Sequence, residues 1–239
     1  MMSWGFRYIR FHGIFDDDLL VIQRLTDYFN FAAMPWAKGV QELSFRQIAN
    51  VFDNVLKCGM KPFVELSFMP STIAKGKKVG LRYRNHIDMP KHMERWCDLV
   101  EKFIRFLLNR YGKEEVESWY FEVWNEPDLP IFFHGKQQDY FDLYAATVQT
   151  VKNVNPALRV GGPSTSACRW VDDFKTYCEK NHVPYDFLTT HHYPGDGFGN
   201  SFGIKDAFKM MKITHDNAKN GVDLGDTLTR YFFLSLIHI

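Results

Sequence analysis

The chain has 239 residues, which is enough for one large domain with a sizeable core. Its 29 lysine and arginine residues nearly balance its 28 aspartate and glutamate residues, so neither nucleic acid nor an anionic membrane is expected as a partner. Aromatic residues make up 16% of the chain, a content that suits a sugar-binding cleft and a bulky core equally well.

The sequence gives no sign of membrane insertion, export or a cysteine metal site. No stretch approaches the roughly 18 apolar residues of a membrane span, and the start, MMSWGFRYIR, lacks the apolar centre of a signal peptide. We therefore expect a cytoplasmic protein, although a missing start would remove an export signal. The four cysteines form no C-x-x-C pair and are expected to be reduced, structural thiols: Cys58, Cys97, Cys168 and Cys178.

Short apolar runs alternate with longer helical patterns, which is typical of βα units on a parallel sheet. The first strand is predicted at Phe6–His12. The segment Asp16–Val40 is less regular and is predicted to be a long loop, of the kind that shapes the substrate cleft in barrel enzymes.

A helix is predicted next, with Ser44 at its N-cap and Gly59 where it stops. Strand Lys61–Phe68 follows, and Pro90 is expected to open another helix that ends at Gly112. The remaining predicted elements are strand Trp119–Trp124, helix Gln137–Val154, strand Leu158–Gly162, helix Trp170–Asn181, strand Asp186–His191 and helix Ile204–Asn220. All five strands are expected to be parallel.

Polar residues with catalytic potential gather where the predicted strands finish. They are His12, Asn125, Glu126, His191, His192 and Tyr193. In a closed (β/α) barrel these strand ends meet at one face, which is the face that carries active sites. A carboxyl group there, between aromatic walls, loses solvent; this favours its protonated form and suits a general acid. Spacing alone also allows Glu126 to be a structural, salt-bridged carboxylate.

Several motifs together indicate a family. WNEPD after a strand resembles the acid/base motif of the large barrel clan of retaining glycoside hydrolases. Five stretches in this order resemble glycoside hydrolase family 39: YIRFHGIFDDD, KPFVELSFMP, WYFEVWNEP, RVGGPST and TTHHYP. The resemblance runs from about Gly5 to Pro194. It implies an α/β fold, the (β/α)8 TIM barrel, and an activity among those of the family, which contains β-xylosidases and α-L-iduronidases.

The resemblance also implies roles for the strand-end residues. Glu126 is expected to protonate the glycosidic oxygen and then activate water, while Asn125 binds the sugar 2-hydroxyl. His12 is expected to line the subsite of the sugar that is attacked. The family pattern T-H-x-Y carries over to His191 and Tyr193 and leaves His192, in the variable place, with a structural role.

Charged residues inside the predicted strands need partners. By alternation Tyr8, Arg10 and His12 share one face of the first strand. Glu122, Trp124 and Glu126 are expected to share one face of the third strand in the same way. We hypothesise that Arg10 and Glu122, possibly with Glu65, form a buried ion pair or network beneath the site, because unpaired charges there are too costly.

In this clan the acid/base follows the fourth strand and the nucleophile follows the seventh, whereas Glu126 follows the third strand predicted here. The resemblance therefore implies that residues 1–222 form a partial barrel of about strands two to six, without the nucleophile. Asp223 and Asp226 are not expected to replace it. The tail 223–239 is unlike the family and suggests a sequence artefact. An open barrel exposes two sheet edges, so low stability and no turnover are predicted.

Several functions stay open. The leading one is a retaining β-1,4-xylosidase acting on xylo-oligosaccharides without cofactor or metal, as a monomer or oligomer. An α-L-iduronidase-like specificity would need basic residues for the uronate carboxylate, which Arg82 and Arg84 could supply. A non-catalytic sugar-binding fragment is a further alternative. A metal-dependent barrel hydrolase using His12, His191, His192 and an aspartate is another, but it lacks an early H-x-H pair.

Overall fold

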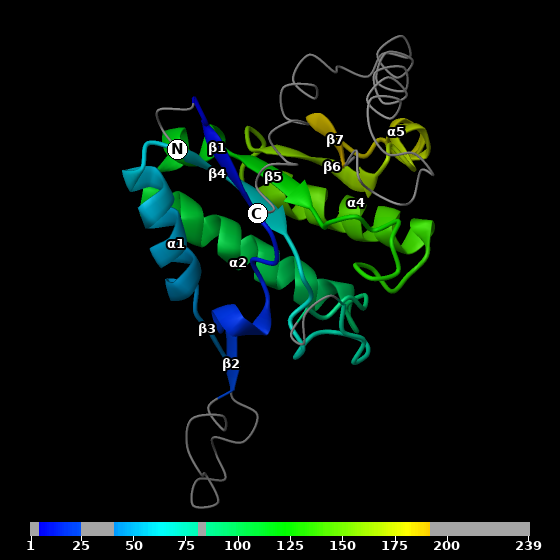
Figure 1. Ribbon diagram of the computed structural model, residues 1–239, viewed down its shortest axis with the longest axis horizontal. Coiled ribbons are helices and arrows are strands. Elements are labelled where there is room, and N and C mark those ends of the chain that lie inside the picture. The colour runs from blue at the N-terminus through cyan, green and yellow to red at the C-terminus, as the bar shows by residue number, and fades with distance from the viewer. Residues whose placement is uncertain (1–4, 25–40, 81–84, 192–239) are drawn as a thin grey trace, which may run out of the picture.

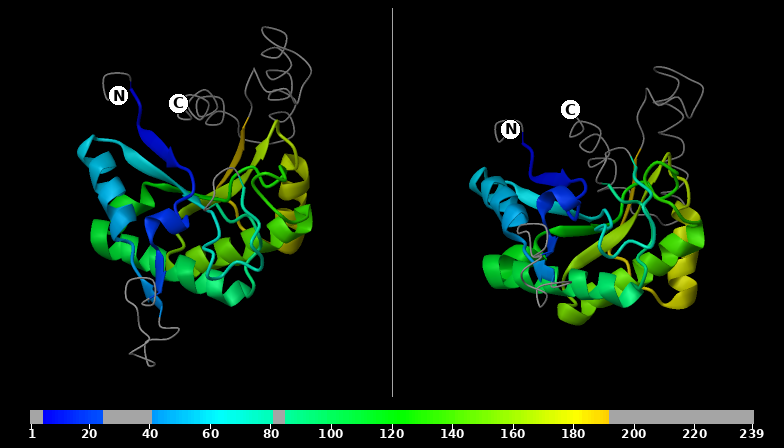
Figure 2. Two further views of the ribbon diagram at one scale, coloured as in Figure 1. Left: turned by 60° about the horizontal axis from the view of Figure 1, so that its bottom comes forward. Right: turned by 90° about the horizontal axis from the view of Figure 1, so that it is seen from below.

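The computed structural model describes residues 5–24, 41–80 and 85–191. In these residues five strands form one sheet in the order β1 (Tyr8–Phe11), β4 (Lys61–Leu66), β5 (Tyr120–Val123), β6 (Arg159–Ser166) and β7 (Phe187–His191). All four pairings are parallel, and the sheet curls as part of a barrel (Figure 2). The predicted partial α/β barrel is confirmed. Predicted helix Ile204–Asn220 and the tail 223–239 lie outside the described residues.

The helices lie on one side of this sheet (Figures 1 and 2). They are α1 (Arg46–Lys57), α2 (Met93–Tyr111), α3 (Lys113–Glu117), α4 (Gln137–Val154) and α5 (Val171–Asn181). Their apolar stripes form the core together with the outward side chains of the strands, as where the ring of Phe52 lies 5.0 Å from that of Phe11. In the described part of the chain no helix has the length and apolarity that crossing a membrane requires.

Helix boundaries follow the sequence signals in part. Helix α4 has the predicted bounds, and Gly112 caps α2. The N-cap of α1 is Phe45 rather than Ser44, and no side chain caps that end. Pro90 does not open α2, because it pairs with Ala74 in an extended bridge before the helix begins at Met93.

The predicted loop Asp16–Val40 is wrong in its first part. A short 3-10 helix (Asp17–Leu19) leads into β2 (Ile22–Arg24), which pairs antiparallel with β3 (Gln41–Leu43). These strands stand apart from the barrel sheet as a separate two-stranded ribbon (Figure 1). Residues 25–40 lie outside the described residues.

The side of the sheet that faces away from the helices, here called the inner face, is built in layers. Near the amino ends of the strands lies an aromatic cluster in which Tyr120 contacts Tyr8, Phe63 and Phe187, with ring centroids 5.2 to 5.6 Å apart. Two residues further along β4 and β5 the inward positions carry Glu65 and Glu122. Polar residues at the carboxyl ends of the strands form the next layer. This stacking of inward side chains is the packing expected inside a (β/α) barrel.

Candidate active site

An ionic layer lies directly beneath the strand ends. Arg10 reaches Glu65 through Nη1, 2.8 Å from Oε2, and Glu122 through Nη2, 2.5 Å from Oε2. Both carboxylates are fully buried, and the parallel register places them directly opposite each other on β4 and β5. Two like charges in that arrangement need a shared cation. The hypothesis of a buried Arg10, Glu122 and Glu65 network is therefore confirmed.

Glu65 collects further hydrogen-bond donors. His12 Nδ1 lies 3.1 Å from Oε2, while Oε1 accepts from the Ser67 hydroxyl and, at 3.4 Å, from the backbone N–H of Gly13. Burial alone would raise the pKa of Glu65, but the charge of Arg10 and the contacts with His12 and Ser67 lower it to about 2. The carboxyl group is therefore ionised at neutral pH and anchors the turn after β1.

This anchoring fixes His12 at the strand end. The His12 ring stands edge-on to Phe68 and Phe132, with centroid distances of 5.1 and 5.9 Å. The next residue, Gly13, has a φ of +75°, and a Cβ there would lie 2.7 Å from a carboxylate oxygen of Asp16. Only glycine fits that turn without strain. The F-H-G motif thus holds an imidazole against aromatic walls.

Asn125 is joined to the same layer. Its Oδ1 accepts from Arg10 Nη2 at 3.0 Å, and the residue is only 2% exposed. Because a guanidinium group only donates, the amide oxygen faces Arg10 and the amide Nδ2 remains as the donor for another partner. An oriented N–H donor of this kind suits a sugar hydroxyl.

Glu126 sits where β5 has already ended. Its φ is +42° and that of Trp124 is +71°, both in the left-handed region. Its backbone N–H donates to the Ser164 carbonyl at 2.8 Å, and its Oε1 lies 3.0 Å from His191 Nδ1 at the end of β7. The residue is 9% exposed. A nearly buried carboxyl group with one imidazole neighbour is arranged for proton transfer.

The left-handed turn corrects one prediction about β5. Trp124 does not share a face with Glu122, because the backbone is no longer extended at that residue. Its indole instead packs toward the helices, with its centroid 6.3 Å from that of Trp96 in α2, and its Nε1 donates to the Phe132 carbonyl at 2.8 Å. Trp124 is therefore part of the core that supports the site.

Sequence reasoning missed two residues of the site. Ser164, fully buried in β6, places Oγ 3.1 Å from Arg10 Nη2 and 3.4 Å from His191 Nε2. Asp128 accepts the Ser166 N–H at 2.9 Å and lies 3.5 Å from Arg169 Nη1, and burial raises its pKa. The motifs RVGGPST and WNEPD contain both residues, but no spacing signal distinguishes them.

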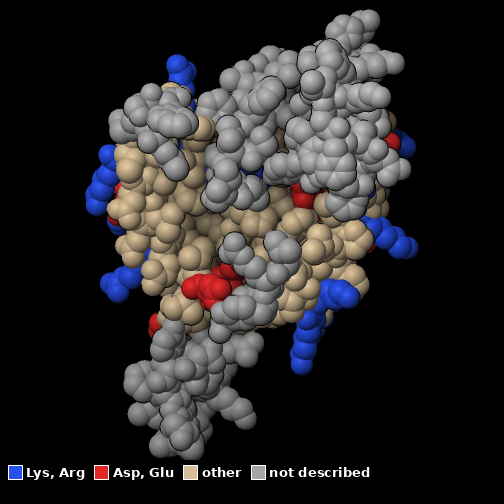
Figure 3. All heavy atoms as spheres, viewed as in Figure 1, with Lys and Arg blue, Asp and Glu red and all other residues tan. Residues whose placement is uncertain are grey.

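The structure thus brings His12, Asn125, Glu126 and His191 together on the predicted face, while Tyr193 and His192 lie outside the described residues. Within the described ranges no group of three His, Cys, Asp or Glu side chains is arranged to hold a metal ion. In the view of Figure 3, Lys and Arg side chains lie mostly at the periphery, and a group of Asp and Glu side chains lies below the middle of the view.

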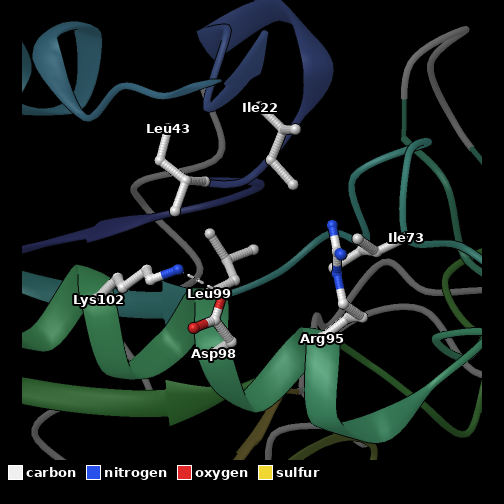
Figure 4. Close-up of a pocket in the computed structure, with 7 residues that line it drawn as sticks. All are labelled: Ile22, Leu43, Ile73, Arg95, Asp98, Leu99 and Lys102. Carbon is white, nitrogen blue, oxygen red and sulfur yellow. Dashed lines mark hydrogen bonds and ion pairs between the residues drawn. The ribbon is translucent and has the colours of Figure 1, made fainter. Parts of the chain in front are cut away.

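A separate hollow of about 160 Å³ lies between the β2–β3 ribbon and α2 (Figure 4). Ile22, Leu43, Ile73 and Leu99 supply its apolar lining, and Arg95, Asp98 and Lys102 complete it. Asp98 and Lys102 pair with each other at 2.7 Å. None of the strand-end residues lines this hollow, so it is distinct from the candidate active site.

Comparison with known proteins defines the class. Residues 2–221 match the family model described as Glycosyl hydrolases family 39. A beta-xylosidase of Caldicellulosiruptor saccharolyticus is 44% identical over 210 residues, which cover 87% of this chain and 41% of that protein. A beta-xylosidase of Geobacillus stearothermophilus is 36% identical over 192 residues, or 79% of this chain and 36% of that protein.

A solved structure of a beta-xylosidase has a similar fold over the matched residues. The crystal structure of a monomeric beta-xylosidase from Caulobacter crescentus CB15 superposes with a TM-score of 0.72 at 38% identity, covering 80% of this chain and 36% of that one. The fold is that of part of a barrel glycoside hydrolase. The chain belongs to glycosyl hydrolase family 39. It spans about two fifths of the length of the curated relatives named above.

Proposed function

We propose that this chain supplies the acid/base part of the active site of a retaining glycosidase that acts on β-1,4-linked xylosides. The observation that carries the proposal is the placement of Glu126: its carboxyl group is nearly buried at the carboxyl end of β5, with His191 on one oxygen. Proton transfer to a leaving-group oxygen needs a carboxyl group held in this way.

The neighbouring residues then take distinct roles. Asn125, oriented by Arg10, binds the hydroxyl group at C2 of the sugar through Nδ2. His12, held by Glu65 against Phe68 and Phe132, lines the subsite of the sugar that is attacked. His191 supports Glu126. Tyr193 is assigned to the same site from the sequence motif alone.

A retaining mechanism needs a second carboxylate about 5 Å from the first, acting as nucleophile. On the inner face of the described sheet, Glu65 and Glu122 are both bound to Arg10 beneath the site. Neither is therefore free to attack a sugar. Residues 192–239 contain no glutamate, and Asp223 and Asp226 are not expected to replace one. We therefore place the nucleophile outside this chain and expect the 239-residue chain by itself to show no turnover of an aryl β-xyloside.

A xyloside is favoured over an α-L-iduronide by the extent of the similarity. The beta-xylosidase relative from Caldicellulosiruptor matches over 87% of this chain, whereas human alpha-L-iduronidase matches over 30% at 40% identity. Arg82 and Arg84, which an iduronidase-like site would use, lie outside the described residues.

The test is a hybrid enzyme in which residues 5–191 replace the matching segment of the Caldicellulosiruptor relative, so that both carboxylates are present. We expect the hybrid to hydrolyse an aryl β-xyloside. Substitution of Glu126→Gln should lower kcat by about 10²- to 10⁴-fold, the usual contribution of an acid/base residue. Glu114→Gln on the exposed side of α3 is the matched control and should leave kcat unchanged.

A second measurement identifies the role of the carboxyl group. Azide needs no general base, so it should restore turnover of an activated aryl xyloside by the Glu126→Ala hybrid and yield the β-xylosyl azide. A Glu126→Gln hybrid with full activity would refute the assignment. A hybrid that binds xylo-oligosaccharide without hydrolysing it, with or without Glu126, would favour the non-catalytic sugar-binding function instead.

A further inference from the structure

The hydroxyl group of Ser164 connects the ionic layer to the candidate acid/base. Ser164 Oγ lies 3.1 Å from Arg10 Nη2 and 3.4 Å from His191 Nε2. The other nitrogen of that ring, Nδ1, lies 3.0 Å from Glu126 Oε1. Arg10, Ser164 and His191 are each at most 5% exposed, so water competes little for these contacts.

The chemistry of the groups and the burial of Ser164 together indicate the direction of each hydrogen bond. A guanidinium group can only donate, so the Ser164 oxygen accepts from Arg10. A buried hydroxyl donor needs an acceptor, and among the described residues His191 Nε2 is the one acceptor in hydrogen-bond contact with Ser164 Oγ. The hydroxyl proton of Ser164 is therefore directed to His191 Nε2, which must be unprotonated to accept it. In a neutral imidazole one nitrogen is protonated and the other is not, and the proton of His191 therefore sits on Nδ1, facing Glu126.

We propose that Ser164 is a positioning residue that holds His191 in its Nδ1-protonated tautomer, so that His191 donates to Glu126 Oε1. The inference rests on the proposed function of Glu126 as the acid/base. The backbone of Ser164 contributes as well, because its carbonyl accepts the N–H of Glu126 at 2.8 Å. One residue of β6 thus contacts both the main chain of Glu126 and the ring that binds its carboxyl group.

The tautomer decides where Glu126 holds its transferable proton. With Nδ1–H in place, Oε1 is an acceptor, and the proton of the carboxylic acid belongs on Oε2. That proton moves from Oε2 to the glycosidic oxygen as the bond from that oxygen to the sugar breaks, and the carboxylate left behind keeps its donor. In a Nε2-protonated ring, Nδ1 would instead accept a hydrogen bond from a protonated Oε1, and the carboxyl proton would point to His191 rather than to the substrate.

Nitrogen NMR of the 239-residue chain with selectively labelled histidine tests the inference without any substrate. The His191 resonances are identified by their loss in His191→Gln. We expect an Nδ1-protonated ring in the unchanged chain at a pH where the ring is neutral. Ser164→Ala removes the donor to Nε2 and should lower the ratio of the Nδ1-protonated to the Nε2-protonated tautomer by about three- to tenfold, the equilibrium effect of one hydrogen bond.

Ser166→Ala is the matched control, because Ser166 is also buried in β6 and contacts Asp128 through its backbone N–H rather than its hydroxyl. It should leave the tautomer unchanged, and circular dichroism should show the same fold for all variants. An Nε2-protonated His191 in the unchanged chain, or a Ser164→Ala spectrum identical to it, would overturn the proposal. If Ser164→Ala does not fold, the spectrum of the unchanged chain still decides.

The tautomer of His191 measured by NMR and the activity of the Glu126→Gln hybrid test two different claims. An Nδ1-protonated His191 together with a fully active Glu126→Gln hybrid would refute the catalytic assignment and leave the hydrogen-bond chain intact. An inactive Glu126→Gln hybrid with an Nε2-protonated His191 would refute the role of Ser164 alone.

Discussion

Two ionic clusters in this protein use similar groups in opposite surroundings. Between α1 and α2, Asp53 accepts from Arg110 Nη2 at 2.5 Å and from the Tyr111 hydroxyl at 2.8 Å. On the inner face of the sheet, Arg10 binds Glu65 and Glu122. The Arg110 side chain is 43% exposed, whereas that of Arg10 is 2% exposed.

Exposure to solvent, more than geometry, sets how much such a cluster contributes to the free energy of unfolding. In the exposed cluster, hydrogen bonds from Arg110 and Tyr111 lower the pKa of Asp53, and burial together with the bond to Asp53 raises that of Tyr111 to about 12. Water can still replace each partner there. In the buried cluster no water replaces a lost partner, so the loss of one charge leaves others uncompensated.

The largest expected effect comes from removing the shared cation. Arg10→Met leaves two buried carboxylates on adjacent strands without their common partner, and the free energy of unfolding should fall by about 3 to 5 kcal/mol. Urea unfolding measures this loss. Arg105→Met, which breaks an exposed i,i+4 pair with Glu101, is the control and should change stability by less than about 0.5 kcal/mol. Similar losses in free energy of unfolding for the two variants would show that burial does not set the contribution of the ion pairs.

The next effect is a dependence on pH. The folded pKa of Glu65 is about 2, below the 4.5 of an unperturbed glutamate. The stability that the ionised group adds is therefore present above pH 4.5 and is lost as the pH falls toward 2. The difference in free energy of unfolding between the unchanged chain and Glu65→Gln should shrink by about 3 kcal/mol across that window. Parallel acid curves for the two proteins would show that Glu65 is not held ionised.

The smallest effect belongs to the exposed cluster. Asp53→Asn removes the charge but keeps an oxygen for the Tyr111 hydroxyl, so the free energy of unfolding should fall by less than about 1 kcal/mol. Added salt should erase this difference, because it screens exposed charges. A loss as large as that of Arg10→Met, or one insensitive to salt, would mean that the pair between α1 and α2 behaves as a buried one.

Much of the barrel was predictable because its signals are local. The five strands are apolar runs set between helical patterns, and α4 has the predicted bounds. The ionic layer was predictable as well, because charged residues inside apolar strands must find partners. The β2–β3 ribbon was not, because strands of three residues are too short to show a period. Pro90 opens no helix, because a bridge to Ala74 overrides the local preference.

The site was predictable only as far as its motifs reach. His12, Asn125, Glu126 and His191 meet at the strand ends as expected, because parallel strands place their carboxyl ends together. Ser164 was not foreseen, since a buried hydroxyl has the same sequence signal as an exposed one. The orientation of Trp124 was missed because alternation holds only while the backbone stays extended, and β5 ends one residue earlier.

The left-handed backbone at Glu126 has a consequence for laboratory evolution of this protein. A side chain at that φ costs about 1 to 2 kcal/mol relative to glycine. A screen that rewards heat resistance alone will therefore tend to replace the glutamate with glycine and discard the proposed chemistry. Variants that are to be both robust and active must be selected for the two properties in the same round.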